Sequence, residues 1–182
     1  MIKLLPNILS LFRLITSFAL IPFVLKNDLT SALFLFALAS ISDFFDGYVA
    51  RKFLVSSEFG AMLDPLADKV LMTVSYILFA YVKFIPVGIA VIVVARDFLI
   101  LLAVAMCKFS GVDLKMKPLL SSKINTALQL IFIVLVLACN ALLVNIQYLV
   151  EVCAAIVGFS TIFSGAEYVQ KYYWIKGKVF AR

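Results

Sequence analysis

The sequence predicts an all-α membrane protein, a bundle of six transmembrane helices that occupies residues 1–182 as a single domain. Hydrophobic residues make up 65% of the chain and charged residues only 14%, and the mean hydropathy is +1.14, far above that of soluble globular domains. Apolar runs of about 20 residues, the length that crosses a hydrocarbon core of about 30 Å, recur along the chain. The connections between these runs are short, and no polar linker, low-complexity tract or repeat marks a second domain.

The first expected helix, residues 8–25, has one charged residue, Arg13, inside its apolar run. It lacks the small-residue cleavage pattern of a signal peptide, so we expect the segment to be retained. The other helices are expected at residues 29–50, 61–82, 85–107, 119–139 and 145–170. Tyrosine and tryptophan side chains among lysines near the end of the last helix are typical of an anchor at the membrane interface.

Lysine and arginine residues in the helix flanks fall almost entirely on one side of the expected bundle. Cytoplasmic loops retain positive charge, so this asymmetry predicts a multi-pass protein of the cell inner (plasma) membrane with both termini in the cytoplasm. The same signal, together with anionic lipid headgroups, explains the net charge of +6, so no nucleic-acid partner is expected. The cytoplasmic flanks hold Lys3, Arg51, Lys52, Lys108, Lys115, Lys117, Lys171, Lys176, Lys178 and Arg182, against Lys26 and Lys83 opposite.

The second expected helix ends in a polar stripe. Asp43, Asp46, Gly47 and Ala50 fall at i, i+3, i+4 and i+7, so they share one helix face. The two carboxylates repel each other unless a cation lies between them, and the two small residues leave space beside the backbone. Arg51 follows directly and has a planar fork of donors that suits a diphosphate, although it also fits the flanking positive charge.

The third expected helix repeats the arrangement, because Gly60, Asp64 and Asp68 lie at i, i+4 and i+8. A connection of about ten residues predicts that these two helices pack as an antiparallel hairpin, which brings the two carboxylate pairs together near the cytoplasmic interface. Convergent carboxylates in a chain with no histidine indicate a hard divalent cation, Mg²⁺ or Mn²⁺. Four aspartates can hold two such ions, an arrangement typical of phosphodiester chemistry, and a carboxylate beside them is the natural general base.

The fourth and fifth expected helices carry a second polar set. Arg96 and Asp97 lie in the fourth, and in the fifth Ser122, Asn125 and Gln129 form a stripe with Lys123 and Thr126 beside it. This stripe either leads polar groups from the interface into the bundle or supplies hydrogen bonds between helices. Lys123 is a candidate for ion pairing or for phosphate binding.

Together the aspartate residues and their neighbours resemble the signature of the CDP-alcohol phosphatidyltransferase family at every defining position: Asp43-x2-Asp46-Gly47-x2-Ala50-Arg51-x8-Gly60-x3-Asp64-x3-Asp68. The resemblance implies a six-helix membrane fold, usually a homodimer, with an active site open to the cytoplasmic leaflet. It also implies metal-dependent transfer of a phosphatidyl group from CDP-diacylglycerol to an alcohol, with CMP as the leaving group.

The resemblance also assigns roles to these positions. The four aspartates are similar to the family's metal ligands, and Asp68 is similar to the base that activates the acceptor hydroxyl. Gly47, Ala50 and Gly60 match the small positions against which the cytidine nucleotide packs, and Arg51 matches the residue that contacts the diphosphate.

Two branches of the family compete for the acceptor alcohol. Phosphatidylglycerophosphate synthases, which use glycerol 3-phosphate, have a second arginine downstream in helix four and a second basic residue in helix five. Residues 98–106 contain no arginine, and Asn125 stands at the second basic position. The chain therefore resembles more the cardiolipin synthases that use phosphatidylglycerol, with Arg96 and Lys123 as candidate contacts of the acceptor phosphate.

Other classes of membrane protein fit parts of the pattern. A proton-coupled transporter also has charges inside a bundle, but here the charges cluster at one interface and no inverted repeat is visible. A membrane prenyltransferase also combines aspartate-rich motifs with Mg²⁺, but lacks the Gly-x2-Ala-Arg element. A purely structural role remains if the ionisable residues only pair between helices: Arg13, Asp43, Asp46, Arg51, Asp64, Asp68, Lys69, Arg96, Asp97 and Lys123.

Overall fold

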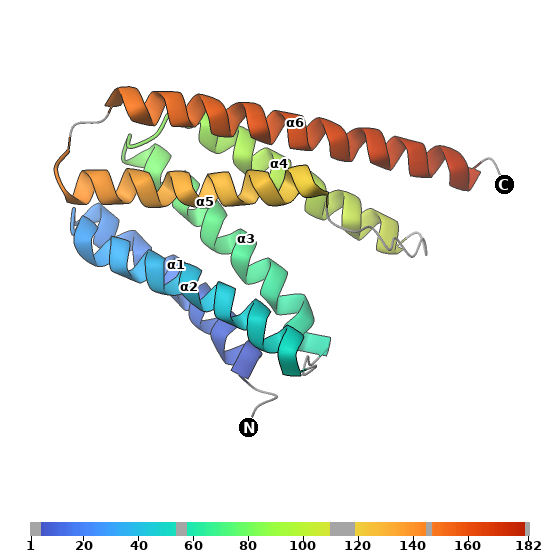
Figure 1. The fold of residues 1–182 in the computed structure, drawn as a ribbon, viewed down its shortest axis with the longest axis horizontal. Coiled ribbons are helices and arrows are strands. Elements are labelled where there is room, and N and C mark those ends of the chain that lie inside the picture. Colours follow the sequence, from blue (N-terminus) through green and yellow to red (C-terminus); the bar gives the residue numbers. More distant parts are fainter. Residues whose placement is uncertain (1–4, 54–57, 110–118, 145–146, 181–182) are drawn as a thin grey trace. The chain divides into compact units, whose positions relative to one another are not determined.

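The computed structural model describes the backbone of residues 5–53, 58–109, 119–144 and 147–180, and the side chains of residues 10–42, 67–102, 119–144 and 147–170. These residues form helices and no strand (Figure 1). The helices are α1 (Leu5–Leu25), α2 (Leu29–Phe53), α3 (Glu58–Tyr81), α4 (Val87–Phe109), α5 (Leu120–Ala141) and α6 (Gln147–Phe180).

The described residues form six helices, as expected, and the differences lie at their ends; that all six cross a membrane stays a prediction. Helix α6 ends at Phe180 rather than near residue 170, α2 ends at Phe53 rather than near residue 50, and α3 begins at Glu58 rather than near residue 61. Hydropathy marks where a helix meets the membrane interface, whereas the backbone continues to form helix through the polar residues beyond it. At 34 residues, α6 is about 51 Å long and exceeds a hydrocarbon core of about 30 Å.

The chain divides into two compact units. The first unit comprises Met1–Phe84 and Ile133–Ile146, and the second comprises Ile85–Phe132 and Gln147–Arg182. Helix α5 is continuous and contributes its C-terminal half to the first unit and its N-terminal half to the second. That the whole chain is one domain stays a prediction.

In the first unit, α1 packs against both α2 and α3. Its buried face changes character along the helix, from polar Ser10, Arg13 and Ser17 to apolar Leu20 and Val24. The spacing of these residues, i, i+3, i+7, i+10 and i+14, is that of a single helix face. Helix α1 therefore presents hydroxyl groups and one guanidinium to the two helices that carry the predicted aspartates.

In the second unit, α4 packs against α6. A glycine allows this close approach, because a Cβ atom added at Gly158 would lie only 3.0 Å from Cδ1 of Ile89. Close helix approach at small residues is common in membrane proteins, where packing replaces the hydrophobic effect as the force between helices.

Three helices end in the same way, with a non-glycine residue in the left-handed region: Asn27 (φ 61°), Lys83 (φ 62°) and Leu143 (φ 55°). At Lys83 the hydrogen bonds are those of a Schellman motif, from Phe84 N to Phe79 O (2.8 Å) and from Lys83 N to Ala80 O (3.2 Å). The rings of Phe79 and Phe84 supply the apolar contact that accompanies this motif, with centroids 6.0 Å apart. The connections are therefore tight.

The distribution of polarity is the reverse of that in a soluble protein. Each helix exposes large apolar side chains, such as Phe18, Phe34 and Phe159, while hydroxyl, amide and guanidinium groups lie inside. Many of the hydroxyl groups bond to the carbonyl four residues earlier in their own helix, as Ser75 does to Leu71 O at 2.8 Å. Helices Leu120–Ala141 and Gln147–Gln170 are long and apolar enough to cross a membrane by length and composition. These features identify a membrane protein.

Candidate active site

The four predicted metal ligands lie on two helices of the first unit. Asp43 and Asp46 belong to α2, and Asp64 and Asp68 belong to α3, so the helical spacing on which the prediction depends is present in the backbone. The side chains of Asp43, Asp46 and Asp64 lie outside the described residues, as do those of Gly47, Ala50, Arg51 and Gly60. Of the predicted set in this unit, Asp68 is the member whose side chain is described.

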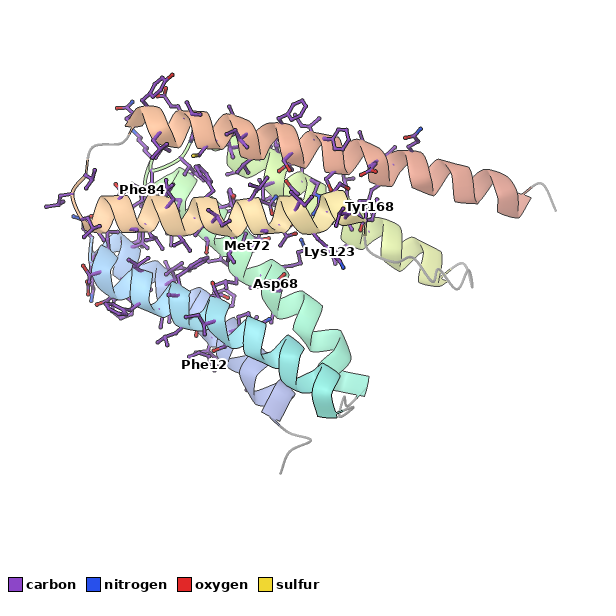
Figure 2. All side chains as sticks on the ribbon, in the orientation of Figure 1. Phe12, Asp68, Met72, Phe84, Lys123 and Tyr168 are labelled. Atoms are coloured by element: carbon purple, nitrogen blue, oxygen red, sulfur yellow. The ribbon has the colours of Figure 1, made fainter. Side chains whose placement is uncertain are left out.

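Asp68 lies half-buried on α3 (Figure 2). The helix face that it shares continues through Met72, Tyr76 and Phe79, all of which are buried. Asp68 therefore stands at the N-terminal end of the described part of this face, next to the apolar run. Its side chain is partly exposed.

A buried cation lies on the helix that packs against α2 and α3. Arg13 of α1 has no exposed surface, and Ser10, Thr16 and Ser17 beside it are also buried. A charge in such a place is costly unless groups of opposite charge or hydrogen-bond acceptors surround it. The first unit thus combines an internal cation with the two helices that carry the aspartates.

The donor set fits a hard divalent cation. Two pairs of carboxylates at i, i+3 and at i, i+4 each lie on one helix face, and the chain has no histidine that would favour zinc or copper. Among the side chains that the structure describes, no group of three or more His, Cys, Asp or Glu residues lies together. Three of the four predicted ligands fall outside those side chains, so the metal site stays a prediction.

The second unit contains a buried polar cluster around Arg96, which we call the Arg96 cluster: Arg96, Asp97, Ser122, Ser164 and Tyr168. Nη1 of Arg96 lies 2.6 Å from Oδ1 of Asp97. Nη2 donates to the hydroxyls of Ser122 on α5 and Ser164 on α6, each at 2.7 Å. The ring of Tyr168 on α6 lies 5.9 Å from Cζ of Arg96, within the range of a cation–π contact. One guanidinium thereby joins α4, α5 and α6.

A second set of hydrogen bonds joins α5 and α6 about one helical turn further along. The hydroxyl of Thr161 lies 2.9 Å from Oδ1 of Asn125 and 2.7 Å from the carbonyl oxygen of Val157. Nε2 of Gln129 donates to the same hydroxyl at 3.3 Å. Asn125, Gln129 and Thr161 are all fully buried. The expected polar stripe of helix five therefore makes hydrogen bonds between helices, one of the two interpretations of its sequence.

The two candidate contacts of the acceptor phosphate differ in environment. Arg96 is 5% exposed and its Nη atoms are engaged with protein groups, whereas Lys123 is exposed on α5 (Figure 2). Nε of Arg96 is buried and has no hydrogen-bond partner among the described residues. Arg96 is thus held by protein groups, whereas Lys123 lies at the surface. Their role in acceptor binding stays a prediction.

Three residues of α6 were not identified from the sequence as members of a polar site. Thr161, Ser164 and Tyr168 lie at i, i+3 and i+7, and this spacing is the signal that could have revealed a shared face. Tyr168 was interpreted as part of an interfacial anchor, but its ring approaches Arg96. Small hydroxyl residues are frequent in membrane helices, so the spacing alone does not identify their partners.

Comparison with known proteins agrees with the motif. The family model of CDP-alcohol phosphatidyltransferase matches residues 3–160. A cardiolipin synthase (CMP-forming) from Rattus norvegicus is 35% identical over 149 residues, which covers 73% of this chain and 49% of the relative. The cardiolipin synthase (CMP-forming) of Homo sapiens is 33% identical over 149 residues, which covers 73% of this chain and 50% of the relative.

A relative from another branch matches over nearly its whole length. The CDP-diacylglycerol–glycerol-3-phosphate 3-phosphatidyltransferase of Rickettsia bellii is 34% identical over 170 residues, which covers 90% of this chain and 92% of the relative. By contrast, the chain spans about half the length of the two cardiolipin synthases above. The motif, the helical fold and the extent of these matches lead to one conclusion: the chain belongs to the CDP-alcohol phosphatidyltransferase family.

Proposed function

We propose that this protein transfers a phosphatidyl group from CDP-diacylglycerol to an alcohol in a metal-dependent reaction that releases CMP. The observation that carries the proposal is the complete Asp43 to Asp68 motif on α2 and α3, at spacings that place each aspartate pair on one helix face. Family membership supports the same activity. The burial of Arg13 on the helix packed against α2 and α3 fits a site where negative charge gathers.

The four aspartates would hold two Mg²⁺ or Mn²⁺ ions, which supply neutralisation of phosphate oxygens when bound. Gly47, Ala50 and Gly60 have little or no side chain, so they leave room for the cytidine nucleotide against the backbone. Arg51 would bind the diphosphate through its guanidinium fork. In this proposal the donor lipid binds near the C-terminal end of α2 and the N-terminal part of α3.

The reaction balances as a direct displacement. The acceptor oxygen forms a bond to the β-phosphorus of CDP-diacylglycerol, and the bond from that phosphorus to the bridging oxygen breaks, so CMP departs with the electron pair. The Asp68 carboxylate accepts the proton of the attacking hydroxyl. Its half-buried position on α3 is compatible with contact to both a substrate and the other carboxylates.

For the acceptor we propose phosphatidylglycerol, which makes the product cardiolipin. The positive charge of Arg96 is already paired with Asp97 at 2.6 Å, whereas Lys123 is exposed and has no ion pair with a described residue, so Lys123 would supply the cation of the two candidates. One net positive charge suits the single negative charge of a phosphodiester better than the dianion of glycerol 3-phosphate. Asn125, at the position where the other branch has a basic residue, is buried and bonded to Thr161.

The alternative acceptor is glycerol 3-phosphate. It is favoured by the relative from Rickettsia bellii, whose name specifies glycerol 3-phosphate and 92% of whose length is matched by this chain. We further propose that all six helices cross the cell inner (plasma) membrane, that both termini and the site face the cytoplasm, and that the protein is a homodimer. The apolar exposed faces of all six helices and the charge asymmetry of the flanks support this arrangement.

The test is a CMP-release assay with purified protein. Protein in detergent receives radiolabelled CDP-diacylglycerol and Mg²⁺, with phosphatidylglycerol or glycerol 3-phosphate offered in separate reactions. Asp68→Asn removes the proposed base, and we expect it to lower the rate by at least about 100-fold. Asp28→Asn is the matched control, because Asp28 is exposed, caps α2 through Ser31 N at 3.2 Å, and asparagine caps equally well.

Each outcome decides a different part of the proposal. A labelled lipid formed only with phosphatidylglycerol supports the cardiolipin assignment. Product formed only with glycerol 3-phosphate overturns the acceptor but keeps the chemistry. The proposed activity is wrong if no CMP is released with either acceptor or with a wider panel of alcohols. It is also wrong if Asp68→Asn leaves CMP release unchanged.

A further inference from the structure

We propose that Ser164 of α6 is a positioning residue for Arg96 and that acceptor recognition therefore depends on α6 as well as on α4 and α5. The inference rests on the proposed function and on the prediction from the sequence that Arg96, through its remaining donor, contacts the acceptor phosphate beside Lys123. Ser164 does not touch the acceptor in this account. It acts by fixing the orientation of the guanidinium.

The geometry of Nη2 carries the argument. This nitrogen has two hydrogens, and both are used, one by Ser122 Oγ and one by Ser164 Oγ, each at 2.7 Å. Because the two hydroxyls come from different helices, they fix both the plane of the guanidinium and its rotation about the side-chain axis. Asp97 holds Nη1 at 2.6 Å on the adjacent corner. Three corner contacts from α4, α5 and α6 leave the guanidinium a single orientation.

The position of Nε follows from that orientation. Nε of Arg96 is buried and has no hydrogen-bond partner among the described residues. Leaving a charged donor unsatisfied inside a protein is costly, so a donor held in this state indicates a site built for an acceptor oxygen. Ser164 itself is fully buried, and a Cβ atom added at the next residue, Gly165, would lie 3.6 Å from Cγ of Arg96. Helix α6 thus passes close to the stem of Arg96 as well as bonding its head group.

The kinetic test compares Ser164→Ala, Ser164→Thr and Ser160→Ala. Ser160 lies one turn earlier on α6 and is half-buried, and it is the matched control. We expect Ser164→Ala to raise KM for the acceptor about tenfold, because a guanidinium that can rotate no longer holds its donor in the orientation that binds the acceptor phosphate. The kcat and the KM for CDP-diacylglycerol should stay within about twofold of wild type. Ser164→Thr, which keeps the hydroxyl, and Ser160→Ala should resemble wild type.

A second readout does not depend on activity. In protein labelled with ¹⁵N-arginine, the Nε–H resonance of Arg96, assigned by its loss in Arg96→Lys, should be sharp in wild type and broadened in Ser164→Ala, because the guanidinium then rotates. Ser122→Ala should broaden the same resonance.

The inference would be overturned if Ser164→Ala left the acceptor KM unchanged, or if it changed kcat and both KM values in parallel. It would also be overturned if the Nε–H resonance of Arg96 stayed sharp in Ser164→Ala. A wild-type protein that releases no CMP with any alcohol would instead refute the proposed function, and the resonance would still decide whether Ser164 orders Arg96.

Discussion

The substitution Thr161→Val removes one hydroxyl at the junction of α5 and α6 and leaves the shape of the side chain nearly unchanged. That hydroxyl is the donor to Asn125 Oδ1 at 2.9 Å and the acceptor from Gln129 Nε2 at 3.3 Å. Its single proton is shared between Asn125 and the Val157 carbonyl, which lies 2.7 Å away. Nδ2 of Asn125 has no partner among the described residues, so the substitution removes the one hydrogen bond that the structure shows for this buried amide.

The magnitude follows from this bonding pattern. A buried amide left unsatisfied costs roughly 1–3 kcal/mol, whereas hydrogen bonds between membrane helices average only about 0.6 kcal/mol, with a maximum of about 1.7. No cavity is created, because valine fills the volume of threonine. We therefore expect Thr161→Val to lower the free energy of unfolding by about 1–2 kcal/mol, measured by reversible unfolding in mixed micelles with circular dichroism.

A double-mutant cycle isolates the pair. Asn125→Leu replaces the amide with an apolar group of similar shape, and removing both partners of a buried hydrogen bond is less costly than removing one. The double variant Asn125→Leu/Thr161→Val should therefore be more stable than the sum of the single effects predicts, by about 1 kcal/mol. Strict additivity, or a Thr161→Val variant as stable as wild type, would refute the argument that the two side chains depend on each other.

Further predictions concern helix ends and packing, and thermal unfolding in detergent measures all of them. Asp28→Ala should destabilise the protein by about 1 kcal/mol, because it removes the cap on Ser31 N, and a Tm equal to that of Asp28→Asn would contradict this. Leu143→Gly should stabilise it by up to about 1 kcal/mol, since a leucine at φ 55° is strained, and a lowered Tm would exclude that explanation. Gly158→Leu should lower the free energy of unfolding by about 1–3 kcal/mol, because even a Cβ atom at this position would lie 3.0 Å from Ile89 Cδ1. Gly158→Ala should lower it by less, and equal losses for the two variants would contradict a steric origin.

The sequence predicted the number and order of the helices because each apolar run is long and uninterrupted. It did not predict the extension of α6 to Phe180, since Lys171 and the residues beyond it no longer follow an apolar pattern although their backbone continues as helix. The division into two compact units was also not predicted. Hydropathy measures how well each helix suits a lipid environment and carries no information about which helices pack together.

For the candidate site, the sequence predicted best what depends on spacing within one helix. The pairs Asp43–Asp46 and Asp64–Asp68 needed only the helical repeat, and the structure places both pairs in helices. The stripe of Ser122, Asn125 and Gln129 was recognised for the same reason. What remained unpredicted was the partner of each group, because partners belong to helices distant in sequence: Ser164 lies 68 residues from Arg96, and Thr161 lies 36 residues from Asn125.

The pair Arg96–Asp97 shows why burial changes the interpretation of a charge. Adjacent residues on a helix point about 100° apart and are not expected to meet, so from the sequence Arg96 is a candidate contact of the acceptor phosphate and its pairing with Asp97 is not predicted. The long side chain of Arg96 nevertheless reaches Oδ1 of Asp97 at 2.6 Å, because an arginine that is only 5% exposed must find acceptors within the protein. The charge of Arg96 is therefore paired with that of Asp97, and its Nη2 donates hydrogen bonds to Ser122 and Ser164. The two proposed acceptor contacts therefore differ in kind, because Arg96 is held by protein groups and Lys123 is exposed. If both bind the acceptor phosphate as proposed, the CMP-release assay should show that Arg96→Lys impairs the choice between phosphatidylglycerol and glycerol 3-phosphate, while Lys123→Arg is tolerated.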